Sequence, residues 1–143
     1  MILLPNGVLV YNAVPFTIKF WTPAWGSDDN AVIEVPSDGV LSASVYEEVI
    51  KNEYGVTVVT PRFMPDPAGR ELIEKAQAMF ADVMGKDDGQ YKDAKLAVIV
   101  GSIVAAQAYP GEVVGMITQK GYEHVPPYQR RIRPDRFRVY DRK

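Results

Sequence analysis

The chain has 143 residues, of which 47% are hydrophobic and 24% charged, and this is the composition of one ordinary globular domain. It has no cysteine and a single histidine, His124, which excludes disulfides, thiol nucleophiles and histidine-rich metal sites, and we predict no metal ion and no cofactor. No apolar run approaches the roughly 20 residues of a membrane span, and the N-terminus lacks the pattern of a secretory signal. We therefore expect a cytoplasmic protein that does not act at a membrane.

The antiparallel strands predicted at the N-terminus come from runs of apolar residues separated by turn residues. Residues 8–11 and 16–21 flank a short break, and apolar and polar side chains alternate in the second run with a period of two. Residues 31–35 predict a third strand. Pro36-Ser37-Asp38-Gly39 then predicts a turn in which Gly39 adopts a positive φ, and residues 40–41 are expected to return along the sheet.

A short helix is predicted from Ser42 or Ser44 to Asn52. Either serine can cap its start, and Val45, Val49 and Ile50 recur at helical spacing with Gly55 beyond the end. The helix would place its apolar side chains on the core.

A β-branched strand is predicted at residues 56–60, where Pro61 closes it. The strongest helical pattern follows at Pro67 to about Met84, with Asp66 as its N-cap and apolar residues at intervals of three and four.

A β-α-β unit is predicted in the second half of the chain. It consists of an apolar strand at 96–100, a helix at 102–108 capped by Ser102, and a strand at 112–117, with Gly101 permitting a tight turn. Residues 136–140 alternate again and predict a terminal strand. The expected fold is therefore a single α+β domain over residues 1–143, with a mixed sheet, one long helix and one or two short ones.

Charge is unevenly distributed along the chain. The net charge is −2, yet residues 126–143 hold seven basic side chains against two acidic ones, a net of +5, so the rest carries −7. Five of the arginines form the predicted partner-binding set: Arg130, Arg131, Arg133, Arg136 and Arg138. This asymmetry predicts that the segment meets acidic groups of its own domain, of a protein partner or of a nucleic acid. The low sequence pI of about 5.4 favours an acidic protein surface over nucleic acid.

Catalytic chemistry has one candidate pair, Ser102 and His124. A serine after a buried strand and an imidazole in a proline-stiffened loop could serve as nucleophile and general base. However, Val100 and Val104 occupy the positions where a nucleophile elbow carries glycines. The alternative interpretation is that Ser102 caps a helix and that His124 is an ordinary loop residue.

Two further sites are weaker predictions. Gly101, Ser102 and Lys120 could bind an anion at a helix start, although no glycine-rich phosphate loop accompanies them. Trp21 and Trp25 lie close together in the sequence and are either core residues or a contact for a partner.

Two stretches carry a family resemblance. Asn12-Ala13-Val14-Pro15-Phe16 and Ile99-Val100-Gly101-Ser102, with the segment after it, resemble a group of small uncharacterised proteins of phage and bacterial genomes. In that group the first stretch usually reads Thr-Pro-His, where this chain has Val14, Pro15 and Phe16. The resemblance implies a phage accessory protein and no particular reaction.

Three functions follow as hypotheses. The leading one is a non-catalytic, phage-encoded binding protein that docks on a macromolecular machine, for example the host transcription machinery, and modulates or inhibits it. The second is a small hydrolase or nucleotide-binding enzyme that uses Ser102 and His124. The third is a virion or self-assembling structural protein.

Overall fold

The computed structural model describes residues 1–21, 32–86 and 88–140. Its elements run in the order β1 (Ile2–Leu3), β2 (Val8–Asn12), β3 (Ile18–Trp21), β4 (Val32–Val35), β5 (Ala43–Glu53), β6 (Val56–Pro65), α1 (Pro67–Val83), β7 (Leu96–Gly101), α2 (Ile103–Ala108), β8 (Val114–Thr118), the 3-10 turn η2 (Pro127–Gln129) and β9 (Arg131–Arg138). The predicted α+β class with a mixed sheet is confirmed.

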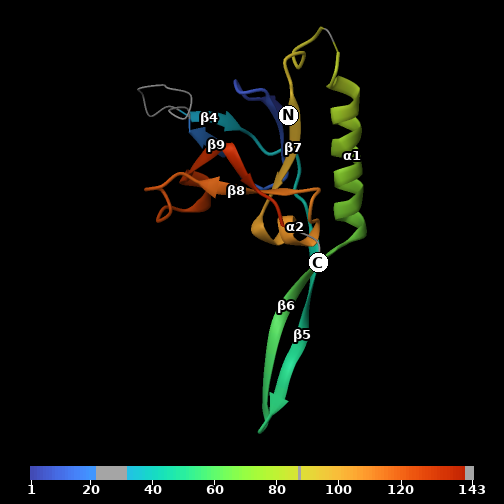
Figure 1. The fold of residues 1–143 in the computed structure, drawn as a ribbon, viewed down its shortest axis with the longest axis vertical. Helices are drawn as coiled ribbons and strands as arrows, with labels where there is room; N and C mark the ends of the chain where they lie inside the picture. Colours follow the sequence, from blue (N-terminus) through green and yellow to red (C-terminus); the bar gives the residue numbers. More distant parts are fainter. Residues whose placement is uncertain (22–31, 87, 141–143) are drawn as a thin grey trace.

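Seven strands form one mixed sheet in the order β1-β2-β7-β8-β9-β3-β4, and β5 and β6 form a separate two-stranded hairpin. The pairs β2–β7, β7–β8 and β3–β9 are parallel. The pairs β1–β2, β3–β4 and β8–β9 are antiparallel. In Figure 1 the hairpin extends away from the rest of the molecule, and α1 runs beside the sheet in the opposite direction.

Two hydrophobic clusters lie on the two faces of the large sheet, because side chains alternate between faces along each strand. The first joins Tyr11 and Ile99 of the sheet to Ile73 of α1 and to the alanines of α2. The second joins Val10 of β2 to Phe20 of β3, although β7, β8 and β9 separate these strands in the sheet order. The sheet therefore curls around its second cluster.

Asn12, a fully buried polar residue, ties the end of β2 to the end of β4. Its side-chain amide donates to the carbonyls of Phe16 at 2.9 Å and Val35 at 2.8 Å. Its side-chain oxygen accepts from the Val14 N–H at 2.9 Å. All of these groups are therefore satisfied away from water, as burial requires.

The predicted β-α-β unit is confirmed, with β7 and β8 parallel and α2 between them. Ser102 is the N-cap, and its Oγ accepts a hydrogen bond from the Ala105 N–H at 3.1 Å. Gly101 is not at a positive φ. A side chain at residue 101 would place its Cβ 2.7 Å from Val113 Cγ1. Close packing around the end of β7 therefore requires this glycine, and a tight turn does not.

The helix predicted at 67–84 is confirmed as α1, with Asp66 at its N-cap accepting from the Gly69 N–H at 2.7 Å. The strand predicted at 31–35 is confirmed over Val32–Val35, within the described residues. The terminal strand begins earlier than predicted, at Arg131, and ends at Arg138.

The helix predicted from Ser42 or Ser44 to Asn52 is wrong, because this segment is the strand β5. Its apolar spacing fits a helix, but its four large apolar side chains are all β-branched or aromatic, and it pairs with β6 from end to end. The strand predicted at 56–60 does not end at Pro61 but continues to Pro65.

Three expectations for residues 8–41 are also corrected. The runs at 8–11 and 16–21 are not neighbours, because β2 pairs with β1 and β7 while β3 pairs with β4 and β9. Residues 40–41 form no strand. Gly39 does not have a positive φ.

Candidate functional site

The hairpin of β5 and β6, residues 43–65, is the most distinctive surface feature of the described chain, and we call it the arm. Its strands pair antiparallel from Ala43–Pro65 at the root to Glu53–Val56 at the tip. At about 3.4 Å per residue, a strand of this length reaches roughly 35 Å. Almost every residue of both strands is exposed. An isolated two-stranded hairpin is marginally stable in water, so the arm has unusually little packing for its length.

One face of the arm is apolar. Opposite residues share a face in an antiparallel pair, which places Val45 with Phe63, Glu47 with Pro61 and Val49 with Val59 on this side. Glu47 is the one charged residue in these three pairs. Val45, Val49 and Val59 are exposed, while Phe63 packs against the first core cluster at the root. Exposed apolar groups gathered in this way indicate an interaction surface.

The other face of the arm carries ion pairs among further exposed apolar side chains, Tyr46, Val56, Val58 and Met64. Glu48 pairs with Arg62, and Lys51 Nζ lies 3.3 Å from Glu53 Oε2. The pairing shifts between Val49 and Lys51, where β5 carries an extra residue, Ile50. Because of this bulge, Glu48 opposite Thr60 and Lys51 opposite Val58 lie on the same face although they are three residues apart.

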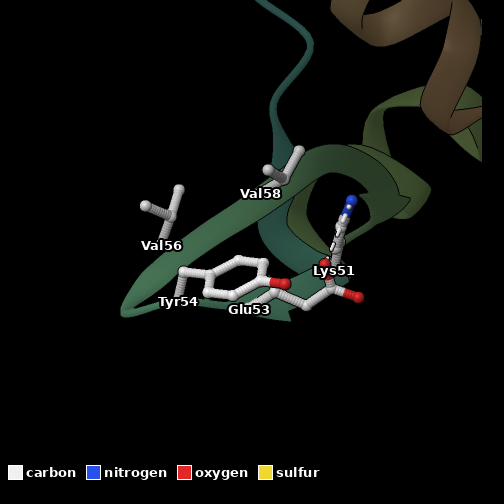
Figure 2. A pocket seen from close by; sticks show the side chains of 5 residues that line it. All are labelled: Lys51, Glu53, Tyr54, Val56 and Val58. Atoms are coloured by element: carbon white, nitrogen blue, oxygen red, sulfur yellow. Dashed lines mark ion pairs between the residues drawn. The ribbon is translucent and has the colours of Figure 1, made fainter.

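The tip of the arm carries an exposed aromatic side chain in a costly backbone conformation. Tyr54 and Gly55 form the turn with φ values of 55° and 74°, the combination of a type I′ turn that favours Asn-Gly. Tyr54 is 99% exposed. Figure 2 shows Tyr54 with Lys51, Glu53, Val56 and Val58 around a shallow depression. A bulky residue kept in this conformation at full exposure points to a role in contact.

The root of the arm is held by the buried side chain of Tyr109, which follows α2. Its hydroxyl donates to the Ser42 carbonyl at 3.0 Å and accepts from the Asp66 N–H at 3.0 Å. Asp66 also accepts from the Ser42 hydroxyl at 3.0 Å while it caps α1. The two ends of the arm are thereby fixed to each other and to α1.

Gly69 allows the hydroxyl of Tyr109 to reach this position, because a Cβ at residue 69 would collide with it. The guanidinium of Arg70 lies 5.3 Å from the centre of the Tyr109 ring and pairs with Glu112 at 2.6 Å. The hydrogen bond from Glu112 raises the pKa of Arg70 above its ordinary value. The root is therefore a packed junction held by several side-chain hydrogen bonds.

The five predicted partner-binding arginines lie along β9 and just before it. Arg133 forms a bidentate pair with Asp135 of the same strand, at 2.9 and 2.7 Å. This hydrogen bonding lowers the pKa of the Asp135 carboxyl below its ordinary value. Arg131 lies over the Tyr122 ring at 5.6 Å, and Arg130 donates to the Val125 carbonyl at 3.0 Å.

Arg136 and Arg138 are exposed. Within residues 1–21, 32–86 and 88–140, neither forms an ion pair. The basic strand is therefore not neutralised by acidic side chains of the described body, which leaves its positive charge available.

Ser102, His124 and Lys120 are all exposed, and the structure gives them no shared site. Ser102 Oγ serves as the cap of α2, and the hydrogen bonds recorded for the described residues include none between it and His124. A shallow groove beside Gly101 is lined by Ile103, Thr118 and Arg130 among others, and its lining includes neither Ser102, Lys120 nor His124. With only six residues, α2 is too short for its N-terminus to form an anion site by itself.

Trp21 lies at the end of β3, opposite Val32, and is partly buried with its ring N–H lacking a hydrogen-bond partner among the described residues. Trp25 lies outside the described residues.

Two further kinds of functional feature are absent from the described residues. No helix among them is long and apolar enough to cross a membrane. They contain no group of three or more His, Cys, Asp or Glu side chains arranged to hold a metal ion.

Sequence analysis missed the arm as a candidate site because it assigned residues 42–52 to a helix. A signal was present, since the β-branched run 56–60 follows Tyr54-Gly55 directly and Val45, Tyr46, Val49 and Ile50 precede it. Two β-branched runs around a turn ending in glycine are typical of a hairpin.

Comparison of the chain with protein-family models, with curated proteins and with solved structures gave no match.

Proposed function

We propose that this protein is a non-catalytic binding protein that docks on a macromolecular partner through its arm. The observation that carries the proposal is the arm itself: a hairpin of residues 43–65 with nearly all of its side chains in solvent, including large apolar ones on the face of Val45, Val49 and Val59. Binding that covers this face would stabilise both the complex and the arm, because it removes apolar area from water.

The fixed root of the arm supports this function. The hydroxyl of Tyr109 and the side chain of Asp66 hold both ends of the hairpin against the body. A hairpin held in one direction loses less conformational entropy on binding than a free peptide. The arm is thus suited to present its side chains to a partner.

The basic strand supplies a second contact. Arg136 and Arg138 are exposed and carry positive charge that acidic side chains of the described body do not neutralise. An acidic protein surface fits this charge, and steering by the arginines would raise the rate of association. Nucleic acid is the other acidic partner that such a strand fits.

Site-specific photo-crosslinking tests the proposal. A photoreactive residue replaces Tyr54 at the tip in one variant and Leu96, an exposed residue on the large sheet, in the control. In the cells that naturally make the protein, we expect a discrete adduct from position 54 that disappears when Val49→Asp is added, and none from position 96. Equal or absent adducts at the two positions, or a measured turnover that Ser102→Ala abolishes, would contradict the proposal.

A further inference from the structure

The arm offers one open strand edge, and that edge belongs to β5. In the described chain the arm contains only β5 and β6, so each strand has an outer edge without a partner. The edge of β6 is interrupted by two prolines, Pro61 and Pro65. A proline in an edge strand directs its nitrogen to the free side, where it removes a donor and blocks pairing. Residues 43–53 of β5 contain no proline, so its edge keeps its donors.

Two of the four charged residues of β5, Glu48 and Lys51, are complementary about the bulge. Glu48 and Lys51 lie on the same face and at equal distances along the strand from the midpoint between Val49 and Ile50. If two β5 strands lie antiparallel with that midpoint on a two-fold axis, Glu48 of each copy faces Lys51 of the other. Opposite charges directly across two strands stabilise their pairing, and the symmetry supplies the contact twice.

Pairing of two arms also adds the neighbouring strand that the isolated hairpin lacks. Two arms joined through β5 form a four-stranded sheet, and a hairpin needs at least a third strand or a packed face for independent stability. The symmetry brings the apolar faces of both arms onto one side, where Val45 and Val49 of each copy extend a common surface.

From these observations we propose that the partner of the arm is a second copy of this chain, joined through antiparallel pairing of the two β5 edges. This inference rests on the proposed function, since it names the molecule that the arm binds. It also corresponds to the self-assembling protein among the hypotheses from the sequence.

The buried area of such a dimer is compatible with a weak complex. Two strands of about ten residues present a face of roughly 35 by 10 Å. Counted on both copies, this face amounts to roughly 700 Å² in total, which is below the size of stable interfaces and fits a weak association. We therefore expect a weak, concentration-dependent dimer.

A charge exchange tests the register. The dimerisation constant of the full chain is measured by sedimentation equilibrium for the wild type, Glu48→Lys, Lys51→Glu and the double variant. Each single change sets like charges against each other twice, so we expect about tenfold weaker dimers. The double variant restores opposite charges between copies, and its dimerisation should return to within about threefold of the wild type.

The ion pairs within one chain predict the opposite result for the double variant. Glu48 pairs with Arg62 and Lys51 pairs with Glu53 in the same arm, so the double variant loses both pairs and places like charges together. If these internal pairs decide the result, the double variant will be the weakest of the four. That outcome would overturn the inference.

A proline variant tests the edge independently of charge. Glu47 lies directly opposite Pro61, so its N–H also points to the free side of its strand. Glu47→Pro removes this donor while keeping the bonds between β5 and β6, and Glu47→Ala is the matched control. We expect the dimer to be lost with proline and kept with alanine, while circular dichroism reports the same fold for both.

The two proposals can fail separately. A wild-type chain that stays monomeric at millimolar concentration, while position 54 crosslinks to a different macromolecule, overturns the dimer and leaves the proposed function standing. A monomeric chain with no adduct at position 54 overturns both.

Discussion

At the scale of single residues, the buried side chain of Asn12 makes three hydrogen bonds to the backbone. Asn12→Ala leaves the Phe16 and Val35 carbonyls and the Val14 N–H without their partner inside the protein. Since an unsatisfied buried group costs about 1–3 kcal/mol, we expect the free energy of unfolding to fall by about 3 kcal/mol or more. Urea denaturation measures this loss.

The control for this change is Asn6→Ala. Asn6 is exposed, and its amide donates to the Pro134 carbonyl at 2.8 Å. Its side-chain oxygen also accepts from the Val8 N–H at 3.3 Å, so we expect the control to cost about 1–2 kcal/mol, the net value of two partly exposed hydrogen bonds. Equal losses for the two variants would show that Asn12 does not hold the two strand ends together.

Asp135 gives a prediction about pH. The bidentate hydrogen bond from Arg133 lowers the pKa of Asp135 below its ordinary value of 3.8. A lowered pKa in the folded state means that the pair stabilises the fold fully above the ordinary pKa. The stabilisation is lost as the pH falls through the lower, folded-state pKa.

Carboxyl NMR titration checks the cause of this shift. Arg133→Gln should raise the pKa of Asp135 toward its ordinary value, while Arg138→Gln should leave it in place. Arg138 is not among the groups that shift it, whereas Arg136 contributes a smaller attraction. If Arg133→Gln leaves the pKa of Asp135 unchanged, hydrogen bonding from the backbone would account for the lowered pKa instead.

At the scale of elements, the junction between the arm and the body depends on the hydroxyl of Tyr109. Tyr109→Phe keeps the buried ring but removes the hydrogen bonds to Ser42 and Asp66. We expect a loss of about 1–2 kcal/mol in the free energy of unfolding. Relative to the wild type, amide hydrogen exchange should accelerate more at the arm root than in β7, because the arm can open locally while the body stays folded.

Tyr91→Phe is the matched control, since it removes one hydroxyl that donates to the Met1 carbonyl at 3.2 Å, far along the chain from the arm. Its effect on exchange should be confined to the N-terminus. Unchanged protection at the root in Tyr109→Phe would mean that packing, rather than the hydroxyl, fixes the arm.

The elements that sequence predicted best are those in which local signals agree with the tertiary environment. For α1, the Asp66 cap, Pro67 and the apolar spacing all indicate one helix, and the structure has it. For β5, spacing alone was ambiguous, because Val45, Val49 and Ile50 fit a helical face as well as a bulged strand. Val45 and Val49 share a face in a strand as well as in a helix, so their spacing does not distinguish the two.

At the scale of the whole molecule, sequence predicted the class of the fold but not the order of its strands. Neighbouring segments suggested that β2 and β3 would pair, yet β9 from the end of the chain lies beside β3, and β7 lies beside β2. Such pairings depend on long-range packing of residues such as Ile132 in the second cluster. The position of the arm could not be predicted for the same reason, since its root is built by Tyr109, more than forty residues from either strand.

The prolines of β6 also decide how large an assembly can grow. If both margins of the hairpin accepted a neighbour, each added molecule would leave another margin open, and the chains would polymerise into an endless ribbon. Pro61 and Pro65 lie along one margin only. In the proposed dimer, association through the other margin would therefore be complete after a single step, and the product would be a closed pair rather than a fibre.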